Sequence, residues 1–388
     1  MRLHSLAFSG YRTFAARSPS APSRPLQHLQ LAPLTILLGK NNSGKSTVAR
    51  ALHHVLLALA SDGNDPFPMS GLGRSYGARF RDIQHDGNFF NPLDLELEVS
   101  SEDGSRAKLQ AQLIQTNDSA DDQPPSFQTL SFMGEAINVE ELPIRGLFPD
   151  IPSADYWRKG ALRLLKASCH LGPMRDSVQH SYAVRDIPST QLPDSNRSVA
   201  QLLLADPTLR AEVEKWMELN LEGWRVDIMR NLDMFSLLAR RSGRETNLAD
   251  SGQGIQQVLP VVTLCKWRSL GRGDSAFIDI IEQPELHLHD AAHAPLGDLL
   301  LSAISNSQGS MVVETHSEAL VLRIRRRIAE GLSPDLVRIL YVADSTDGSQ
   351  LRPIQLRSNG EVDWWPEGVF SEAFVEVKAI RRAQRARE

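Results

Sequence analysis

Residues 39–47 have the types and the spacing needed to bind a phosphate. They read Gly-Lys-Asn-Asn-Ser-Gly-Lys-Ser-Thr, which is a glycine, four residues and then Gly-Lys-Ser. The glycines let the backbone curl so that its N–H groups face an anion, while Lys45 reaches the β- and γ-phosphates and the Ser46 hydroxyl ligates Mg²⁺. The motif therefore predicts a site for a nucleoside triphosphate, and its binding residues are Gly39, Asn41, Asn42, Ser43, Gly44, Lys45, Ser46 and Thr47.

The segments on either side of this loop support that interpretation over a chance glycine-rich turn. Residues 34–38 form a short apolar run typical of a buried parallel strand, and residues 46–60 contain no helix breaker. Residues 10–14 lie between two expected strands at 3–8 and 29–38 and include Arg12. They fit two interpretations equally: contact with the base or phosphates of the nucleotide, or the end of a packed hairpin.

Three later pieces of sequence place polar groups where phosphate chemistry gathers in an α/β protein. Glu282, Gln283 and Glu285 follow the apolar run 277–281, and His316 follows the run 310–314. Ligands of such folds collect at the carboxyl ends of parallel strands, where a carboxylate can hold Mg²⁺ and an imidazole can hydrogen-bond a γ-phosphate. Residues 251–254, Ser-Gly-Gln-Gly, open a probable helix whose N-terminus can meet an anion.

In this order and spacing, the set resembles the ATP-binding-cassette (ABC) superfamily, and within it the soluble branch related to RecF and the OLD-family ATPases. The matches are residues 39–47 (Walker A), 252–260 (signature), 282–289 (Walker B) and 315–317 (switch). Weaker matches are residues 82–87, 171–175 and 365–368. Relatives in this prokaryotic group occur as ATPase partners in anti-phage defence operons.

The resemblance implies ATP and Mg²⁺ as cofactors and a head-to-tail dimer that sandwiches ATP. Lys45, Ser46, Glu282 and His316 of one protomer would hold the nucleotide, and Ser251 and Gly252 of a second protomer would cap its γ-phosphate. The weaker match at 82–87 is the Q-loop region, which adds Gln84 as a metal-site residue. Hydrolysis would release the two heads, so ATP would work as a switch.

Two departures from the family pattern affect the chemistry. The usual Walker B strand ends Asp-Glu, whereas here Glu282 takes the metal position and Gln283 the water position. A glutamine can orient water but cannot accept its proton, so Glu285 is one substitute base and slow turnover is another outcome. Asp279 is the rival metal ligand, but it lies in mid-strand, and Glu282 is favoured. In the signature, Gln253 interrupts the usual double glycine after Ser251.

The expected fold is an α/β ABC-type head with a mixed or parallel core sheet, an antiparallel N-terminal β subdomain and a helical insert. The whole chain, 1–388, forms this single head. Residues 1–60 hold the β region with Walker A, residues 61–245 a β-rich and helical insert, and residues 246–388 the signature, Walker B, switch histidine and α/β tail.

Composition excludes several other classes of protein. The chain has 388 residues, 41% of them hydrophobic, and a formal net charge of −5, so nucleic acid could bind only through a local patch. Its two cysteines have no paired spacing, and no apolar run reaches membrane-spanning length, which predicts a cytoplasmic protein without a membrane partner. His287, His289 and His293 lack the spacing of a zinc motif. No Ser/His/Asp or Cys/His triad is evident.

Three functional hypotheses remain. The first is an ATPase that works as a nucleotide-gated sensor or scaffold for a separate effector protein, such as a nuclease or toxin, in anti-phage defence. The alternative is a RecF-like repair ATPase that clamps DNA when ATP drives its dimerisation. The basic runs at 323–327 and 378–387 favour DNA, whereas the net charge and the missing coiled coil do not. A scaffold that binds nucleotide without hydrolysing it is a third reading, motivated by Gln283.

Overall fold

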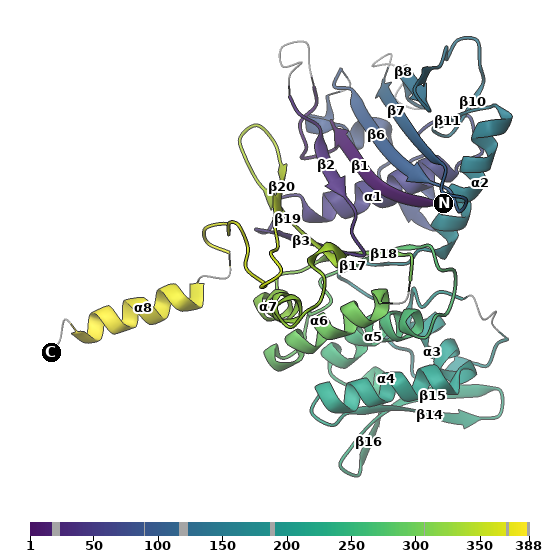
Figure 1. Cartoon of the computed structure of the whole chain (residues 1–388). Coiled ribbons are helices and arrows are strands. Elements are labelled where there is room, and N and C mark those ends of the chain that lie inside the picture. The colour runs from purple at the N-terminus through teal and green to yellow at the C-terminus, as the bar shows by residue number, and fades with distance from the viewer. Residues whose placement is uncertain are drawn as a thin grey trace.

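The chain folds into stacked layers that run from a β-rich end to a helical end (Figure 1). The computed structural model describes residues 1–17, 24–88, 90–115, 123–186, 191–305, 307–369 and 372–385. The connector expected at 18–25 and the acidic loop expected at 117–126 lie largely outside these ranges. Helix α8 (Glu372–Arg385) extends away from the layered body.

A six-stranded sheet in the middle of the molecule carries the phosphate loop. Its strands are β12 (His170–Leu171), β17 (Ile278–Glu282), β18 (Ser310–Glu314), β3 (Leu34–Gly39), β19 (Val337–Ala343) and β20 (Gln350–Ile354), in that spatial order. The first five are parallel to one another, and β20 pairs antiparallel with β19. The prediction of a parallel α/β core is therefore confirmed, and the carboxyl ends of β17, β18 and β3 meet at one edge.

An antiparallel sheet covers one side of this core, as predicted for the N-terminal β subdomain. Its order is β2 (Gln27–Gln30), β1 (Arg2–Ser9), β6 (Leu93–Ser100), β7 (Arg106–Ile114), β8 (Ser126–Phe132) and β9 (Glu135–Ala136). The prediction of one strand over 29–38 is wrong, because β2 and β3 belong to different sheets. A turn separates them, in which the Ala32 N–H donates to Thr35 Oγ1 at 3.0 Å.

Two helices fill the space between these sheets, and short hairpins close its edges. The helices are α1 (Lys45–Ala60) and α2 (Pro152–Ala167). The hairpins join β4 (Ser70–Gly71) to β5 (Arg74–Ser75) and β10 (Ile144–Arg145) to β11 (Phe148–Pro149). Two 3₁₀ turns, Phe80–Asp82 and His85–Gly87, occupy the weak Q-loop match.

The opposite face of the central sheet is covered by helices and a second, smaller sheet. The helices are α3 (Asn196–Ala205), α4 (Pro207–Asn220), α5 (Gln253–Ser269), α6 (Asp290–Ile304) and α7 (Glu318–Ala329). The strands are β13 (Tyr182–Ala183), β14 (Arg225–Asn231), β15 (Met234–Arg241) and β16 (Arg244–Asn247). Residues 199–221 carry apolar side chains at helical spacing, as a single helix would, but the chain breaks at Asp206, whose carboxylate caps α4 through the N–H groups of Thr208 and Leu209.

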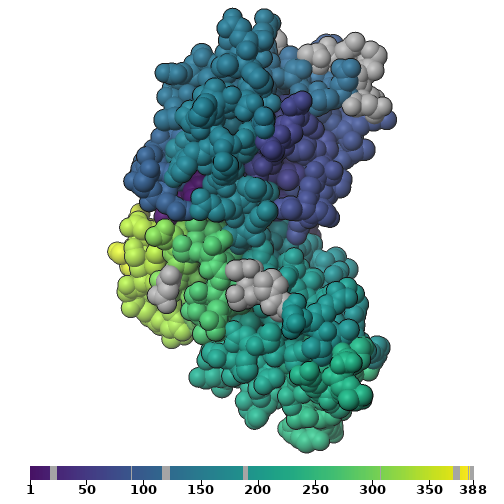
Figure 2. All heavy atoms as spheres, turned by 90° about the vertical axis from the view of Figure 1, so that its right-hand side faces the viewer, coloured from purple at the N-terminus to yellow at the C-terminus, as the bar shows by residue number. Residues whose placement is uncertain are grey.

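Two hydrophobic cores lie on the two faces of the central sheet, and strand β3 contributes to both. Leu34, Ile36 and Leu38 pack into the core beside α5 and α6, whereas Leu37 points into the core beside α1. This alternation is that of any strand buried on both faces, and it explains why its sequence is apolar throughout. Figure 2 shows the result from the side: the blue and teal residues, from the chain's first half, form one end of the molecule and residues near 200–250 the other.

Candidate functional site

The phosphate loop links the end of β3 to the start of α1 through a backbone that two glycines make possible. Gly44 caps α1 with φ +101°, and a Cβ there would lie 2.7 Å from Thr13 Oγ1. A Cβ on Gly39 would lie 2.6 Å from both Ser43 Oγ and the Val342 carbonyl oxygen. Any larger residue would therefore fill the cradle or push its walls apart.

Lys45 lies at the base of the loop and is buried. Its Nζ donates to the carbonyl oxygens of Gly39 at 3.0 Å and Lys40 at 2.7 Å. Burial lowers the pKa of Lys45, and the nearby carboxylate of Glu314 raises it in part. The ammonium group is thus held by the loop itself, in a place where an anion offers better partners than two neutral carbonyls.

A cavity of about 330 Å³ opens above the loop at the carboxyl ends of β3, β17 and β18. It brings together most of the predicted phosphate-loop residues, Gln283 and His316. It also includes two residues that sequence reasoning did not select, Thr13 and Glu314. The lining residues are Thr13, Asn41, Asn42, Gly44, Lys45, Ser46, Thr47, Gln283, Glu314 and His316.

The groups around this cavity fit a nucleotide polyphosphate with its Mg²⁺. Ser43 Oγ is buried in the loop and has no hydrogen-bond partner among the described residues, so a donor is left for a phosphate oxygen. Lys45 and the N-terminus of α1 supply positive charge. Ser46 and Glu314 supply the hydroxyl and carboxylate oxygens that Mg²⁺ prefers.

Gln283, Glu285 and His316 form a connected group at the mouth of the cavity. Gln283 has a left-handed backbone, φ +47°, and its N–H donates to the Glu314 carbonyl oxygen at 2.7 Å. Glu285 Oε1 accepts the His316 N–H at 2.6 Å, which ties the turn after β17 to the turn after β18. His316 is exposed at the mouth, and burial of its inner part, followed by the charge of Lys45, lowers the pKa of the imidazole.

Glu282 lies on the far side of this group and does not line the cavity. Its Oε1 is 2.6 Å from His170 Nε2, and both side chains are buried. Its carbonyl oxygen accepts from Arg175 Nη2 at 2.7 Å, and Arg175 also binds Gln257 of α5. In the weak match at 171–175, Arg175 therefore links the signature helix to the end of β17.

The remaining predicted residues lie outside the cavity. Arg12 donates to the Tyr76 carbonyl oxygen at 2.5 Å, and its neighbour Thr13 takes the place beside the loop. The Gln84 amide donates to the Asn91 carbonyl oxygen at 2.7 Å. Ser251 and Gly252 precede α5, away from the lining residues of the same chain, as expected if they serve a second protomer.

Asp279, the rival metal ligand, forms a buried ion pair instead. It is completely buried in mid-strand, where Oδ2 accepts from Arg268 Nε at 2.8 Å and Oδ1 accepts from Arg268 Nη2 at 2.9 Å. Oδ1 also accepts the Cys169 N–H at 2.8 Å. The carboxylate therefore joins α5 to the central sheet and faces no cavity. Glu282 and Glu314 remain as the carboxylates near the loop.

A group of buried histidines behind the loop was missed because no spacing marks it. His53 and His54 lie side by side on α1, and the ring of His170 is 5.6 Å from that of His53. His53 Nδ1 bonds the Tyr76 hydroxyl, and the His54 ring stacks on Tyr76 at 3.9 Å. Burial lowers the pKa of both His53 and His54 to about 3, so both are neutral in the folded protein at neutral pH.

These histidines predict that the protein loses stability in mild acid. Once the pH falls below the unfolded pKa of 6.5, the unfolded chain binds protons that the folded chain refuses until about pH 3. The free energy of unfolding should therefore fall by about 1.4 kcal/mol per pH unit for each histidine below about pH 6. Urea unfolding at pH 7.5 and pH 5 measures this loss. His54→Gln should reduce this loss of unfolding free energy by the contribution of one histidine. An unchanged pH dependence in that variant would refute the assignment.

The C-terminal motif at 365–368 lies beside the phosphate loop, although the two segments are far apart in the sequence. Gly368 and Val369 line a second cavity, of about 540 Å³, together with Lys40 and His316. Trp365 holds this turn in shape, since its Nε1 donates to the Val369 carbonyl oxygen at 2.9 Å. The weak match at 365–368 thus reaches the cavity beside the phosphate loop through Gly368, and α8 follows it.

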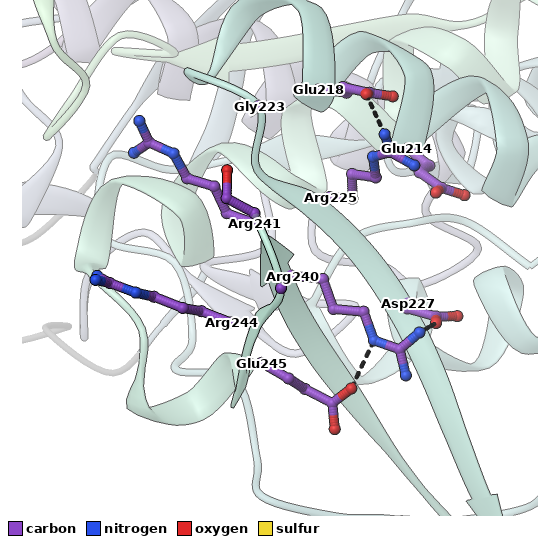
Figure 3. A pocket seen from close by; sticks show the side chains of 11 residues that line it. Glu214, Glu218, Gly223, Arg225, Asp227, Arg240, Arg241, Arg244 and Glu245 are labelled. Carbon is purple, nitrogen blue, oxygen red and sulfur yellow. Dashed lines mark hydrogen bonds and ion pairs between the residues drawn. The ribbon is translucent and has the colours of Figure 1, made fainter.

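Two other groups of polar residues carry no comparable chemistry. A pocket of about 690 Å³ lies between α4 and the β14–β16 sheet, but it is lined by four arginines and four acidic residues, with Arg240 paired to both Asp227 and Glu245 (Figure 3). Such a pocket has no net charge for an anion. His287 and His289 are exposed, and the described residues contain no cluster of three or more metal-ligating side chains.

Comparison with known proteins agrees with this geometry. A family model described as "AAA domain, putative AbiEii toxin, Type IV TA system" matches residues 34–323. A Smc head bound to the C-winged helix domain of ScpA has a TM-score of 0.55 at 10% identity, over 92% of this chain and 99% of that chain. A Smc head with an extended coiled coil, bound to the C-terminal domain of ScpA derived from Pyrococcus furiosus, has a TM-score of 0.54 at 9% identity. The match covers 98% of this chain and 99% of that chain. No curated protein matches. The fold is that of an ABC-type ATPase head, as predicted.

Proposed function

The chain belongs to this AAA-domain family, and on that basis we propose that it binds ATP with Mg²⁺ and hydrolyses the nucleotide. The observation that carries the proposal is the cavity in which the phosphate loop, Gln283, Glu314 and His316 face one another. Phosphoryl transfer needs positioning and charge stabilisation more than covalent chemistry, and these groups supply both. The described residues include no helix long and apolar enough to cross a membrane.

The residues of the site have distinct roles in this reaction. The loop N–H groups and Lys45 bind the phosphates, with Lys45 exchanging two carbonyl partners for phosphate oxygens. The metal ion, when bound, neutralises charge that develops on the phosphates. Gln283 orients the attacking water, and because an amide cannot take its proton, turnover is slow. Glu285 keeps the His316 turn at the cavity mouth.

ATP also controls assembly in this proposal. Gly252 is exposed at the start of α5, with nothing within 4 Å of where a Cβ would lie. Together with Ser251, whose hydroxyl donates to the Leu248 carbonyl oxygen at 2.7 Å, it forms a helix N-terminus that can meet the γ-phosphate held by a second copy of the chain. Binding of ATP then joins two heads, and hydrolysis separates them.

A carboxylate placed at Gly252 tests this arrangement. Gly252 has an ordinary φ of −59°, so Gly252→Glu fits the folded chain but puts a negative charge against the partner's nucleotide. We expect the wild type to double in mass with ATP and Gly252→Glu to remain at its starting mass while still binding ATP. Light scattering with and without ATP measures the mass.

Gly63→Glu provides the matched control, because Gly63 is exposed beyond the far end of α1. This variant should assemble like the wild type. Assembly of Gly252→Glu to the same extent would exclude the head-to-tail arrangement. A wild type that never changes mass with ATP would exclude nucleotide-gated assembly altogether.

A separate effector protein is the proposed output of this switch. The two Smc heads of similar fold are each bound to a domain of another protein, ScpA, and the matched family model is described by a toxin–antitoxin system. We infer a role in anti-phage defence, with a nuclease or toxin as the effector.

The DNA-clamp alternative has less support, because the arginines of the basic run on α7 are paired with groups of the same chain. Arg323 and Arg327 both pair with Asp298 of α6, at 2.5 and 2.6 Å. Arg326 pairs with Glu330 at 2.7 Å, and Arg325 donates to the Gly360 carbonyl oxygen at 2.9 Å. Arginines held in this way offer little charge to a phosphate backbone.

A further inference from the structure

We propose that Glu314, rather than Glu282, is the carboxylate that holds Mg²⁺ together with Ser46. The proposal rests on the ATP binding proposed above and names the metal ligand within that site. Glu314 was not selected from the sequence, because it stands where the last residue of an ordinary buried strand is expected. The structure places it against the phosphate loop.

The contact between Glu314 and Ser46 has the geometry of two ligands on one metal ion. Ser46 Oγ donates to Glu314 Oε2 at 2.8 Å, although the two residues are 268 positions apart in the chain. Adjacent oxygens of an octahedron with Mg–O bonds of 2.0–2.1 Å lie about 2.9 Å apart. The side chains therefore need almost no rearrangement to share the ion.

The order of strands explains why Glu314 is nearer than Glu282. Strand β18 pairs directly with β3, and Glu314 is in register with Leu37, two residues before the loop begins. Strand β17 lies one strand further away, with Glu282 in register with Glu314. Neighbouring strands are about 4.8 Å apart, which is more than twice the length of an Mg–O bond.

Glu282 also has partners that hold it in place. Its Oε1 is hydrogen-bonded to His170 Nε2. Arg74 holds His170 in turn, because Arg74 Nη1 lies 3.0 Å from His170 Nδ1. Release of Glu282 toward the loop would leave the buried His170 without this partner. Glu314 makes no such bond away from the cavity among the interactions of the described residues; its side chain contacts Ser46.

The local charge at Glu314 calls for a cation. Glu314 is buried, and the carboxylates of Glu282 and Glu285 and the ammonium group of Lys45 lie near it. Glu285 Oε2 is buried and has no hydrogen-bond partner among the described residues. Lys45 and Arg175, which interacts with Glu282 and Glu285, together carry one positive charge fewer than the three carboxylates, and a divalent ion beside Glu314 would add positive charge there.

Metal affinity tests the proposal without depending on hydrolysis. The full chain is loaded with a saturating non-hydrolysable ATP analogue and titrated with Mn²⁺, whose free and bound forms electron paramagnetic resonance distinguishes. Glu314→Gln should weaken Mn²⁺ binding at least about tenfold, the usual scale for loss of a metal-site group. Glu282→Gln should weaken Mn²⁺ binding less. The Mn²⁺ affinity of Glu314→Asp should fall between those of Glu314→Gln and the wild type, because the shorter side chain keeps the negative charge but holds it further from the ion.

Binding of the same analogue in EDTA provides the control for each protein. The phosphate loop binds phosphate without the metal, so each folded variant should retain this binding. Equal Mn²⁺ affinity in Glu314→Gln and wild type, or a larger loss in Glu282→Gln, would overturn the assignment. If Glu314→Gln fails to fold, Glu314→Asp decides in the same way. A wild type that binds no analogue with or without Mn²⁺ would instead refute the proposed ATP binding itself.

Discussion

Replacement of Lys45 with alanine should lower the rate of phosphate release from ATP by about 10²- to 10³-fold, the loss seen when one preorganised donor to a transition state is removed. The Nζ of Lys45 is buried at the base of the loop, within 3.0 Å of two carbonyl oxygens that cannot replace it as donors. Affinity for ATP should fall as well, because the ammonium group contacts phosphates before and during the reaction. A coupled phosphate assay and a nucleotide-binding titration measure the two effects.

A lysine elsewhere on the surface gives the matched control. Lys159 of α2 is 72% exposed and pairs with Asp155, so Lys159→Ala removes the same charge from the chain without touching the cavity. This variant should release phosphate at the wild-type rate. Thermal unfolding should show that Lys45→Ala is folded. Equal rates for Lys45→Ala and wild type would mean that the observed hydrolysis comes from another site or from a contaminant.

The largest expected effect on stability comes from Arg268, which pairs with Asp279 in the interior. The two side chains are 1% and 0% exposed, and Arg268 also lies over the ring of Phe277, with 3.6 Å between the guanidinium carbon and the ring centroid. Arg268→Met leaves a buried carboxylate without its cation, which costs about 3–5 kcal/mol. Urea unfolding of Arg268→Met and wild type at pH 7.5 measures the difference.

Two comparisons show whether the carboxylate is the cause. Arg268→Met/Asp279→Leu should recover most of the loss, because a buried ion pair replaced by apolar residues is often neutral in stability. Burial already raises the pKa of Asp279 in the folded protein, and loss of the arginine raises it further. The folded state therefore takes up the proton at a higher pH than the unfolded state, so the deficit of Arg268→Met should shrink as the pH falls toward 5. A deficit that stays constant with pH and persists in the double variant would point to lost packing instead.

Local sequence was sufficient for the phosphate loop and for the class of fold. The loop is a continuous segment whose glycines, lysine and serine act through their own backbone, so its geometry follows from nine adjacent residues. Parallel strands could also be predicted, because strands such as β17 and β18 are buried on both faces and are mostly apolar, with Asp279 as the charged exception inside β17. Helix ends were less certain: only the Asp206 cap, with Pro207 after it, decides that 199–221 is two helices.

What the sequence by itself determined about this protein is the presence of a phosphate-binding loop in an ABC-type head, since both depend on neighbours along the chain. Tertiary structure alone decided which carboxylate faces that loop. Glu282 and Glu314 both end buried parallel strands, and the local sequence pointed to Glu282 through its Walker B match. Strand order puts β18 beside β3, and His170, from a strand about 110 residues earlier, holds Glu282 away. Because such pairings join distant parts of the chain, the metal-binding carboxylate, the histidines behind the loop and the C-terminal wall become visible only in the folded protein.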